Sequence, residues 1–295
     1  MRHPRLAITL GDPRGIGPEV VGKALANPEV RAACHPVVVG ATGTGIDVDE
    51  SVGSWRSSDD EATAGRLAGL AVERATVLAQ ERAVDGIVTA PIDKHALMRG
   101  GYADPGHTEM LARLTSSRTA MMLASDRLRV VLATTHIPLR DVPRALSAHA
   151  IIEAAHLTRA ALRAWFGVAE PRIALCALNP HAGDGGRFGD EDDTRLAPAA
   201  REAGLHGPLP ADTVFVRAMR GDFDAVIAPY HDVGMTAIKV ASFGEAVNLT
   251  LGLPFPRTSP DHGTALDIAG KGIASEASMV RAILMCARIA GLKGR

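Results

Sequence analysis

The chain has 295 residues, of which 46% are hydrophobic, 22% charged and 3% aromatic, and its formal net charge is −1. This composition is typical of a globular protein with one large or two modest domains, and it provides no basic face for a nucleic acid or a membrane surface. No apolar stretch approaches the roughly 18 residues of a membrane helix. Cys34, Cys176 and Cys286 are too far apart for a disulfide framework or a zinc ribbon. We therefore expect a soluble, reduced, cytoplasmic protein.

Short β-branched apolar runs alternate along the chain with longer stretches of helical period. The predicted strands are 6–10, 36–40, 85–90, 128–134, 172–178 and 224–229. The predicted helices are 18–26, 61–81, 94–99, 148–166, 192–203 and 275–292. This alternation predicts an α/β fold in two lobes, with mostly parallel sheets covered on both faces. We expect surface loops at 41–60 and at 179–193, whose acidic residues do not follow the calcium-binding EF-hand spacing.

A glycine-rich turn follows the first predicted strand, over residues 11–19. It invites a dinucleotide-binding interpretation, but the third glycine of G-x-G-x-x-G, counted from Gly15 and Gly17, is replaced by Val20. The next predicted strand also ends without an acidic residue that could bind a ribose. A tight turn that binds no nucleotide is therefore the preferred interpretation.

Three predicted strands are each followed by a histidine, namely His136, His181 and His231. In open α/β sheets, ligands bind beyond the carboxyl ends of the strands. Three imidazoles would leave coordination positions of a divalent cation open for substrate oxygens. The alternative is three unrelated surface histidines, because their spacing matches no short metal motif. Asp232 and Asp212 are candidates for a base or an outer metal shell, and each could instead cap a helix.

Other polar residues suit an anion. Lys94, at the start of a predicted helix, is either an anion contact or a solvated lysine. His107 and Thr108 open a further helix, where they and the backbone amides could bind phosphate, unless Thr108 simply caps that helix. A third candidate receptor for a phosphate or carboxylate consists of Lys239, Asn248 and Arg257. The alternative is that these are dispersed surface cations.

Six motifs occur in an order that is more specific than any one of them. They are GDPRGIGPE (11–19), PGHTE (105–109), TTHIPLRD (134–141), LNPHAG (178–183), YHD (230–232) and DHGTA (261–265). In this order, over residues 6–278, the chain resembles the 4-hydroxythreonine-4-phosphate dehydrogenase family of vitamin B6 biosynthesis.

The resemblance implies an isocitrate/isopropylmalate-dehydrogenase-like fold. The first α/β/α lobe would consist of 1–120 plus 232–295, and the second of 121–231. The active site would lie in the cleft between the lobes, and the interface of a homodimer would complete it. The implied ligands of a divalent metal (Zn, Mg, Co or Mn) are His136, His181 and His231. The implied substrate contacts are His107, Thr108, Lys239, Asn248 and Arg257. NAD or NADP would bind without the glycine fingerprint, and Asp232 or Asp212, with Lys239 nearby, would act as the base.

The implied reaction oxidises 4-phosphooxy-L-threonine at its 3-hydroxyl and then decarboxylates the product to 3-amino-2-oxopropyl phosphate, for pyridoxal phosphate biosynthesis. Alternatives are a 4-phospho-D-threonate or 4-phospho-D-erythronate 3-dehydrogenase, a cis-dihydrodiol carboxylate dehydrogenase, a metal-dependent hydrolase and a non-catalytic binder. Three departures from the family bear on the substrate: the shorter 41–60 region, Val233 in place of a common Gln, and Asp93 in place of a neutral or imidazole side chain. A carboxylate at Asp93 would repel a substrate phosphate unless Lys94 offsets it.

Overall fold

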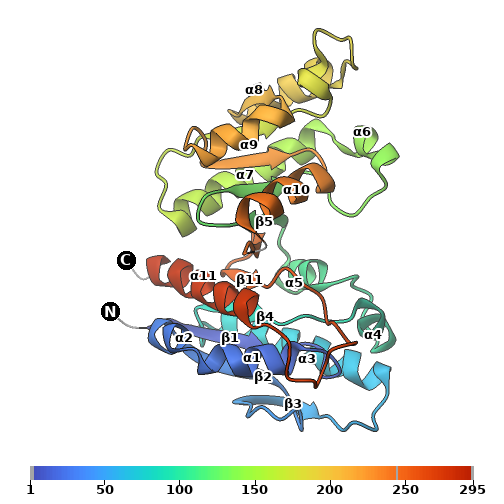
Figure 1. Ribbon diagram of the computed structural model, residues 1–295, viewed down its shortest axis with the longest axis vertical. Coiled ribbons are helices and arrows are strands. Elements are labelled where there is room, and N and C mark those ends of the chain that lie inside the picture. Colours follow the sequence, from blue (N-terminus) through green and yellow to red (C-terminus); the bar gives the residue numbers. More distant parts are fainter. Residues whose placement is uncertain (1–2, 244, 294–295) are drawn as a thin grey trace. The chain divides into compact units, whose positions relative to one another are not determined.

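A computed structural model describes residues 3–243 and 245–293, which form two compact units (Figure 1). The first unit consists of 1–119 and 247–295, and the second of 120–246. The segment 232–246, which the sequence placed with the first lobe, belongs to the second unit. The reason is that its helix α10 (His231–Ser242) packs on strands β6 and β9 of that unit and buries Gly234 and Ile238 there.

The first unit is built on a mostly parallel sheet, as predicted. Its strands are β1 (Arg5–Thr9), β2 (His35–Thr42), β3 (Glu50–Ser54), β4 (Gly86–Thr89), β10 (Val247–Leu251) and β11 (Arg257–Ser259). They lie in the order β3-β2-β1-β4-β11-β10, and β10–β11 is the antiparallel pair. Strand β3 corrects the prediction of a surface loop over 41–60. Its sequence, ESVGS, contains no continuous apolar run because it lies at the edge of the sheet and is largely exposed.

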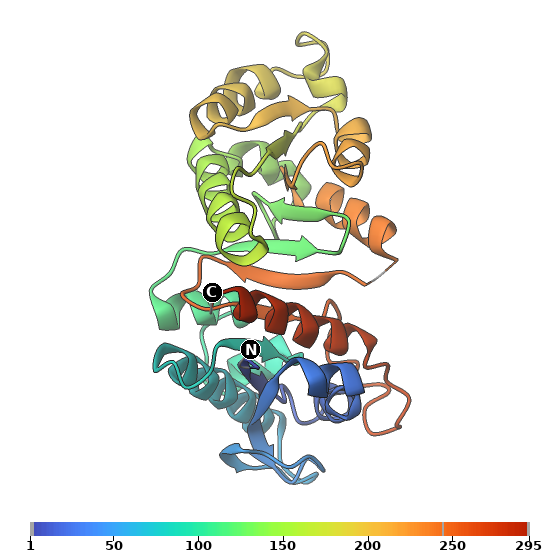
Figure 2. The same ribbon diagram turned by 90° about the vertical axis from the view of Figure 1, so that its left-hand side faces the viewer.

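Helices cover both faces of this sheet (Figure 2). They are α1 (Gly17–Ala26), α2 (Pro28–Ala33), α3 (Glu61–Gln80), α4 (Lys94–Arg99), α5 (His107–Thr115) and α11 (Ala277–Lys293). Helix α3 packs on β1, β2 and β4, while α11 packs on β4, β10 and β11 and contacts α1 and α2. Gly65 of α3 lies against the backbone of Ala96, which allows α4 to approach α3 closely. The absence of a side chain at Gly65 thus lets α4 pack closely against α3.

The strands of the second unit are also mostly parallel to one another. Its strands are β5 (Ala120–Ala124), β6 (Arg129–Leu132), β7 (Ile173–Cys176), β8 (His206–Leu209) and β9 (Ala225–Ala228), in the order β5-β6-β9-β7-β8. The pairs β6–β9, β9–β7 and β7–β8 are parallel, and β5–β6 is antiparallel. Both Val131 and Leu175 are in register with Ile227, so β6, β9 and β7 end at the same edge.

The helices of the second unit also lie on both faces of its sheet, with α7 on one side and α10 on the other (Figure 2). The α-helices besides α10 are α6 (Val142–Ala145), α7 (Ala148–Phe166), α8 (Ala197–Ala203) and α9 (Ala211–Met219). Short turns are η1 (Leu139–Asp141), η2 (Pro180–Gly183) and a π-helical turn, η3 (Asp192–Leu196). In the described residues, no helix has both the length and the apolar character that a membrane span requires.

Backbone packing explains the glycines of the first motif. Gly11 has a φ of +72°, which favours glycine. A β-carbon on Gly15 would lie 2.8 Å from the carbonyl oxygen of Thr264, and one on Gly17 would lie 2.2 Å from that of Leu10. The amide of Ile16 donates a hydrogen bond to the Thr264 carbonyl at 2.9 Å. The first and last recognised motifs are therefore packed together, in agreement with the tight-turn interpretation.

We expect Gly17→Ala to lower the free energy of unfolding by about 1–3 kcal/mol, because its methyl group has no room beside the Leu10 carbonyl. Gly263→Ala is the control, since a β-carbon there meets no heavy atom within 4 Å. We expect that substitution to change stability by less than about 0.5 kcal/mol. Urea unfolding of the three proteins measures both effects, and equal stabilities of the two variants would contradict the packing argument.

Candidate active site

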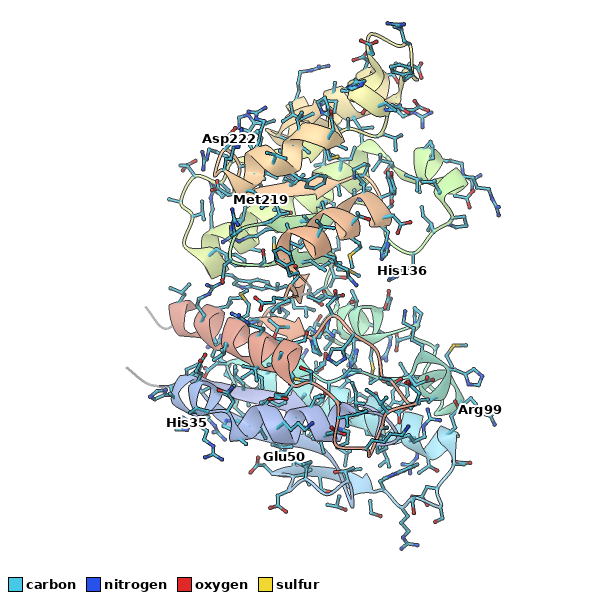
Figure 3. The ribbon with its side chains drawn as sticks, in the orientation of Figure 1. His35, Glu50, Arg99, His136, Met219 and Asp222 are labelled. Atoms are coloured by element: carbon cyan, nitrogen blue, oxygen red, sulfur yellow. The ribbon has the colours of Figure 1, made fainter. Side chains whose placement is uncertain are left out.

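The predicted metal ligands follow the ends of three neighbouring strands, as the sequence suggested. His136 follows β6, His231 follows β9 and His181 follows β7, and β9 lies between the other two strands. The hydroxyl of Thr134 donates to the Pro229 carbonyl at 2.7 Å, which ties the segment after β6 to the segment after β9. The His136 and His231 rings consequently lie 5.5 Å apart, centre to centre, and Figure 3 shows His136 beside the first turn of α10.

His231 has the environment of a metal-ligating imidazole. Its Nδ1 lies 2.7 Å from Oδ1 of Asp232, whose side chain is 85% exposed. A carboxylate at one ring nitrogen fixes the tautomer and orientation of an imidazole and leaves the other nitrogen available to a metal. His136 and His231 therefore fit a divalent cation, with Asp232 as an orienting partner.

His181 lies in a turn of unusual backbone conformation. The φ angles of His181, Ala182 and Asp184 are +53°, +56° and +45°, and those of Gly183, Gly185 and Gly186 are also positive. Left-handed conformation costs a residue with a β-carbon roughly 1–2 kcal/mol. Such strain is found mainly at functional sites, where the surrounding structure enforces it. The turn is thus consistent with a functional role for His181.

A buried carboxylate holds the base of this turn. Asp192 is fully buried, and its two oxygens accept hydrogen bonds from the amides of Leu178 and Asn179 at 2.8 and 2.9 Å. The Asn179 side chain donates to the Glu191 carboxylate at 2.8 Å. A hydrogen bond from the backbone of Glu191 itself, followed by this bond from Asn179, lowers the pKa of Glu191. The expectation of a solvated acidic loop over 179–193 is therefore wrong for Asp192, whose role the sequence pattern did not distinguish from that of its acidic neighbours.

Among the described residues, the ligating atoms of His136, His181 and His231 do not all lie within 4.8 Å of one another. The group that meets this distance is Glu61, Asp93 and His95. Two guanidinium groups already neutralise it, because Arg14 lies 3.4 Å from Oε1 of Glu61 and Arg99, on α4 (Figure 3), lies 3.8 Å from Oε2. Its carboxylates are therefore part of an ion-pair network that disfavours a further cation.

Asp93 belongs to this network. Its Oδ1 accepts a hydrogen bond from the amide of Ala96 at 2.8 Å and so caps α4, and Arg14 lies 3.9 Å from the same oxygen. The carboxylate is therefore already engaged by an amide and a guanidinium. The sequence suggested that the Asp93 carboxylate would repel a substrate phosphate, and this arrangement reduces that repulsion.

In the first unit, Arg257 has the properties of an anion receptor. It is 3% exposed, and its two terminal nitrogens donate hydrogen bonds to the hydroxyls of Thr250 and Thr89. Among the described residues, its Nε is buried without a hydrogen-bond partner. Burial lowers the pKa of Arg257 to about 10, and the nearby Glu109 carboxylate opposes this shift, so the group remains charged at neutral pH. A buried charge that is bonded only to hydroxyls and has no carboxylate in contact is costly, which favours binding of an anion beside it.

His107 and Thr108 form the first turn of α5, close to Arg257. The residue before them, Gly106, occupies the N-cap position and provides no side-chain cap, so Thr108 is not the cap that the sequence allowed. The pKa of His107 lies well below its usual value, first because the ring is buried and then because Arg257 and Lys94 are close. The imidazole is therefore neutral at physiological pH, and its Nε2 is buried without a partner.

The other predicted contacts are distributed between the two units. Asn248 lies on β10 in register with Ser259 of β11, two residues beyond Arg257. Lys239 lies on α10 and Asp212 on the first turn of α9, and α9 packs against the η2 turn that carries His181. Each unit thus brings together part of the predicted set.

Comparison with known proteins identifies the family. Residues 24–286 match the family model of the pyridoxal phosphate biosynthetic protein PdxA. The chain belongs to the PdxA family. It is therefore a dehydrogenase, and the resemblance inferred from the six motifs is confirmed.

Its relatives differ in substrate. A 4-hydroxythreonine-4-phosphate dehydrogenase from Geobacter metallireducens is 44% identical over 329 aligned positions, which cover 99% of this chain and 97% of the relative. A D-threonate 4-phosphate dehydrogenase from Cupriavidus necator is 43% identical, with 97% of each chain covered. The crystal structure of a 4-hydroxythreonine-4-phosphate dehydrogenase from Klebsiella pneumoniae superposes with a TM-score of 0.88 at 39% identity, over 97% of this chain and 99% of that one. Similarity alone therefore does not separate the two substrates.

We expect Asp192→Asn to destabilise this PdxA-family protein by about 1–3 kcal/mol, because one of the two buried amides loses its acceptor. Amide hydrogen exchange should accelerate at Leu178 and Asn179. Asp193→Asn is a matched control, since Asp193 is the exposed neighbour. If both variants exchange at the same rate as the wild type at these two amides, Asp192 does not anchor the turn.

The lowered pKa of His107 predicts a pH dependence of stability. The unfolded chain binds a proton at this histidine below its ordinary pKa of about 6.5, whereas the folded protein does not, so stability falls as the pH drops through this range. In the wild type, His107 should lower the free energy of unfolding by up to about 1.4 kcal/mol for each pH unit below 6.5. We expect His107→Gln to abolish this decrease. Urea unfolding of both proteins at pH 7 and 5.5 measures the difference. Parallel pH dependences would show that His107 titrates normally in the folded state.

Proposed function

We propose that this PdxA-family dehydrogenase is a cytoplasmic enzyme that oxidises 4-phosphooxy-L-threonine at its 3-hydroxyl with NAD or NADP, and that decarboxylation to 3-amino-2-oxopropyl phosphate follows. The observation that carries the proposal is the buried Arg257, which forms no ion pair within the described residues and lies close to the neutral His107 at the start of α5, where no side chain caps the helix. These groups suit the anionic end of a phosphorylated hydroxy acid. The second candidate is 4-phospho-D-threonate, which the Cupriavidus relative favours.

We further propose that one divalent cation, Zn, Mg, Co or Mn, binds to His136 and His231, with His181 as the third ligand. When bound, it would acidify the 3-hydroxyl and stabilise the alkoxide that forms on deprotonation. On the ground of the family resemblance, the site would be completed at the interface of a homodimer. The oriented imidazole of His231 supports the assignment of the metal ligands.

The residues of the chain would divide the work. Arg257, His107, Thr108 and the α5 amides hold the anionic end of the substrate, with Asn248 and Lys239 as further contacts on the ground of the family resemblance. This binding fixes C3 for reaction, and bound NAD or NADP supplies the hydride acceptor there. The oxidised product is a β-keto acid, whose carboxylate leaves as carbon dioxide while the ketone accepts the electron pair.

The base would take the proton of the 3-hydroxyl. Asp232 already bonds to His231, so a proton on that carboxylate would compete with the bond that orients the imidazole. Asp212 has no hydrogen-bond partner within the described ranges and lies on the helix that packs against the His181 turn. We therefore favour Asp212 as the base, with Asp232 as the orienting carboxylate.

Initial rates of nicotinamide reduction test the proposal. The purified protein, supplied with a divalent metal, is offered 4-phosphooxy-L-threonine, 4-phospho-D-threonate and 4-phospho-D-erythronate in parallel, each with a chelator control. We expect chelator-sensitive turnover that is fastest with the first substrate. Faster turnover of either sugar acid would assign the enzyme to sugar-acid catabolism, and no reduction with any of the three would refute the proposed substrates.

His181→Ala tests the metal assignment in the same assay. We expect the variant to fold normally, because His181 is exposed, and to lose at least about a hundredfold in turnover through loss of a metal ligand. Calorimetric titration with the metal should show the corresponding loss of affinity. Unchanged metal binding and turnover would remove His181 from the site.

A further inference from the structure

We propose that Lys94 is a substrate-binding residue that acts with Arg257 to bind a phosphoryl dianion at the first turn of α5. This inference rests on the proposed function, because it specifies the chemical class of the group that the same site accepts. The substrate contacts that the resemblance implies do not include Lys94, which the sequence left open as either an anion contact or a solvated lysine.

The fold directs Lys94 toward the start of α5. Strand β4 ends at Thr89, and Asp93 caps α4, so Lys94 is the first residue of that helix. A β-carbon on Gly106, the N-cap residue of α5, would lie 3.7 Å from Cε of Lys94. The end of the lysine side chain therefore lies beside the segment from which the first α5 amides project.

Lys94 differs from neighbouring cations in having no partner. In the part of the chain that the structure describes, it forms no ion pair and no side-chain hydrogen bond, whereas Arg14 bonds to Asp12 and Arg113 to Asp104 at 2.8 and 2.7 Å. The carboxylates near it do not pair with it. Asp93 caps α4 and faces Arg14. Glu109 is exposed and forms no ion pair among the described residues, but its Oε2 would lie 3.4 Å from the same β-carbon position on Gly106, and its charge raises the pKa of Arg257. Glu109 is therefore the nearby carboxylate that a bound anion would have to displace or pass. Lys94 therefore keeps an available charge in reach of solvent.

Two buried polar atoms at this place also lack a hydrogen-bond partner among the described residues. They are Nε of Arg257 and Nε2 of His107. The charges of Arg257 and Lys94 both lower the pKa of His107, which shows that both cations lie close to this imidazole. The start of α5 adds backbone amides without a side-chain cap. A carboxylate would offer two oxygens and one charge, whereas a phosphoryl group offers three oxygens and nearly two charges to two cations and a helix start. The geometry thus favours phosphate over carboxylate.

Binding of inorganic phosphate tests the inference without reference to the substrate. Calorimetric titration measures the affinity, and ¹H–¹⁵N spectra locate the site through the amides of His107, Thr108 and Glu109. We expect Lys94→Met to weaken phosphate binding about tenfold, through loss of one charge-assisted contact, and Lys94→Arg to retain most of the affinity. The matched control is Arg99→Met, which removes an exposed cation from the other end of α4.

With the phosphorylated substrate, we expect Lys94→Met to raise KM by a similar factor and to leave kcat nearly unchanged, because the contact binds the substrate and the transition state equally. Equal phosphate affinity of Lys94→Met and the wild type, or no change at the three amides, would overturn the inference. Lys94-dependent phosphate binding without turnover of any candidate substrate would instead refute the proposed function and leave this inference standing.

Discussion

Parallel strand pairing is the constraint on which the candidate site depends. Neighbouring parallel strands end at the same edge of a sheet, so the loops that follow them share one place in each unit. In the second unit, the pairing of β6, β9 and β7 brings His136 beside His231 and leads to the turn of His181. In the first unit, β1 and β4 end together and lead to the glycine turn and to α4. The chemistry of both units is therefore a consequence of strand direction.

Buried charges show which part of this arrangement serves structure and which serves binding. Asp12 is fully buried and is neutralised by Arg14, which it holds through both oxygens. Asp192 is equally buried and is satisfied by two backbone amides. Arg257 has hydroxyl partners and forms no ion pair among the described residues, although the nearby Glu109 carboxylate raises its pKa and so partly offsets the effect of burial. Since a buried charge that is only partly compensated reduces stability, we attribute this feature to the anionic ligand proposed above.

The sequence predicted best those elements whose own residues determine their structure. The continuous apolar strands β1, β4, β6, β7 and β9 and the capped helices α3 and α7 agree with their predicted ranges to within one or two residues. The strands that were missed are β3, β5, β8, β10 and β11. Of these, β3 and β11 are short and polar and depend on their sheet neighbours. The strand-end histidines were predicted as a set, but the partnership of Arg257 with Thr89 joins residues 168 positions apart and has no local signal. Burial of Asp192 among exposed acidic residues was equally hidden, because it depends on tertiary packing.

Two of the expected departures from the family, Asp93 and Val233, do not disturb the groups that we propose to bind phosphate and the metal. Asp93 is engaged by α4 and Arg14, and Val233 packs against the apolar core of the second unit. 4-Phosphooxy-L-threonine and 4-phospho-D-threonate share the phosphate, the 3-hydroxyl and the carboxylate, and they differ at C2, where one carries an ammonium and the other a hydroxyl group. Residues such as Arg257, Lys94 and His231 therefore cannot distinguish them. Selection between the two has to come from side chains that face C2, where a carboxylate would favour the ammonium and a neutral donor the hydroxyl.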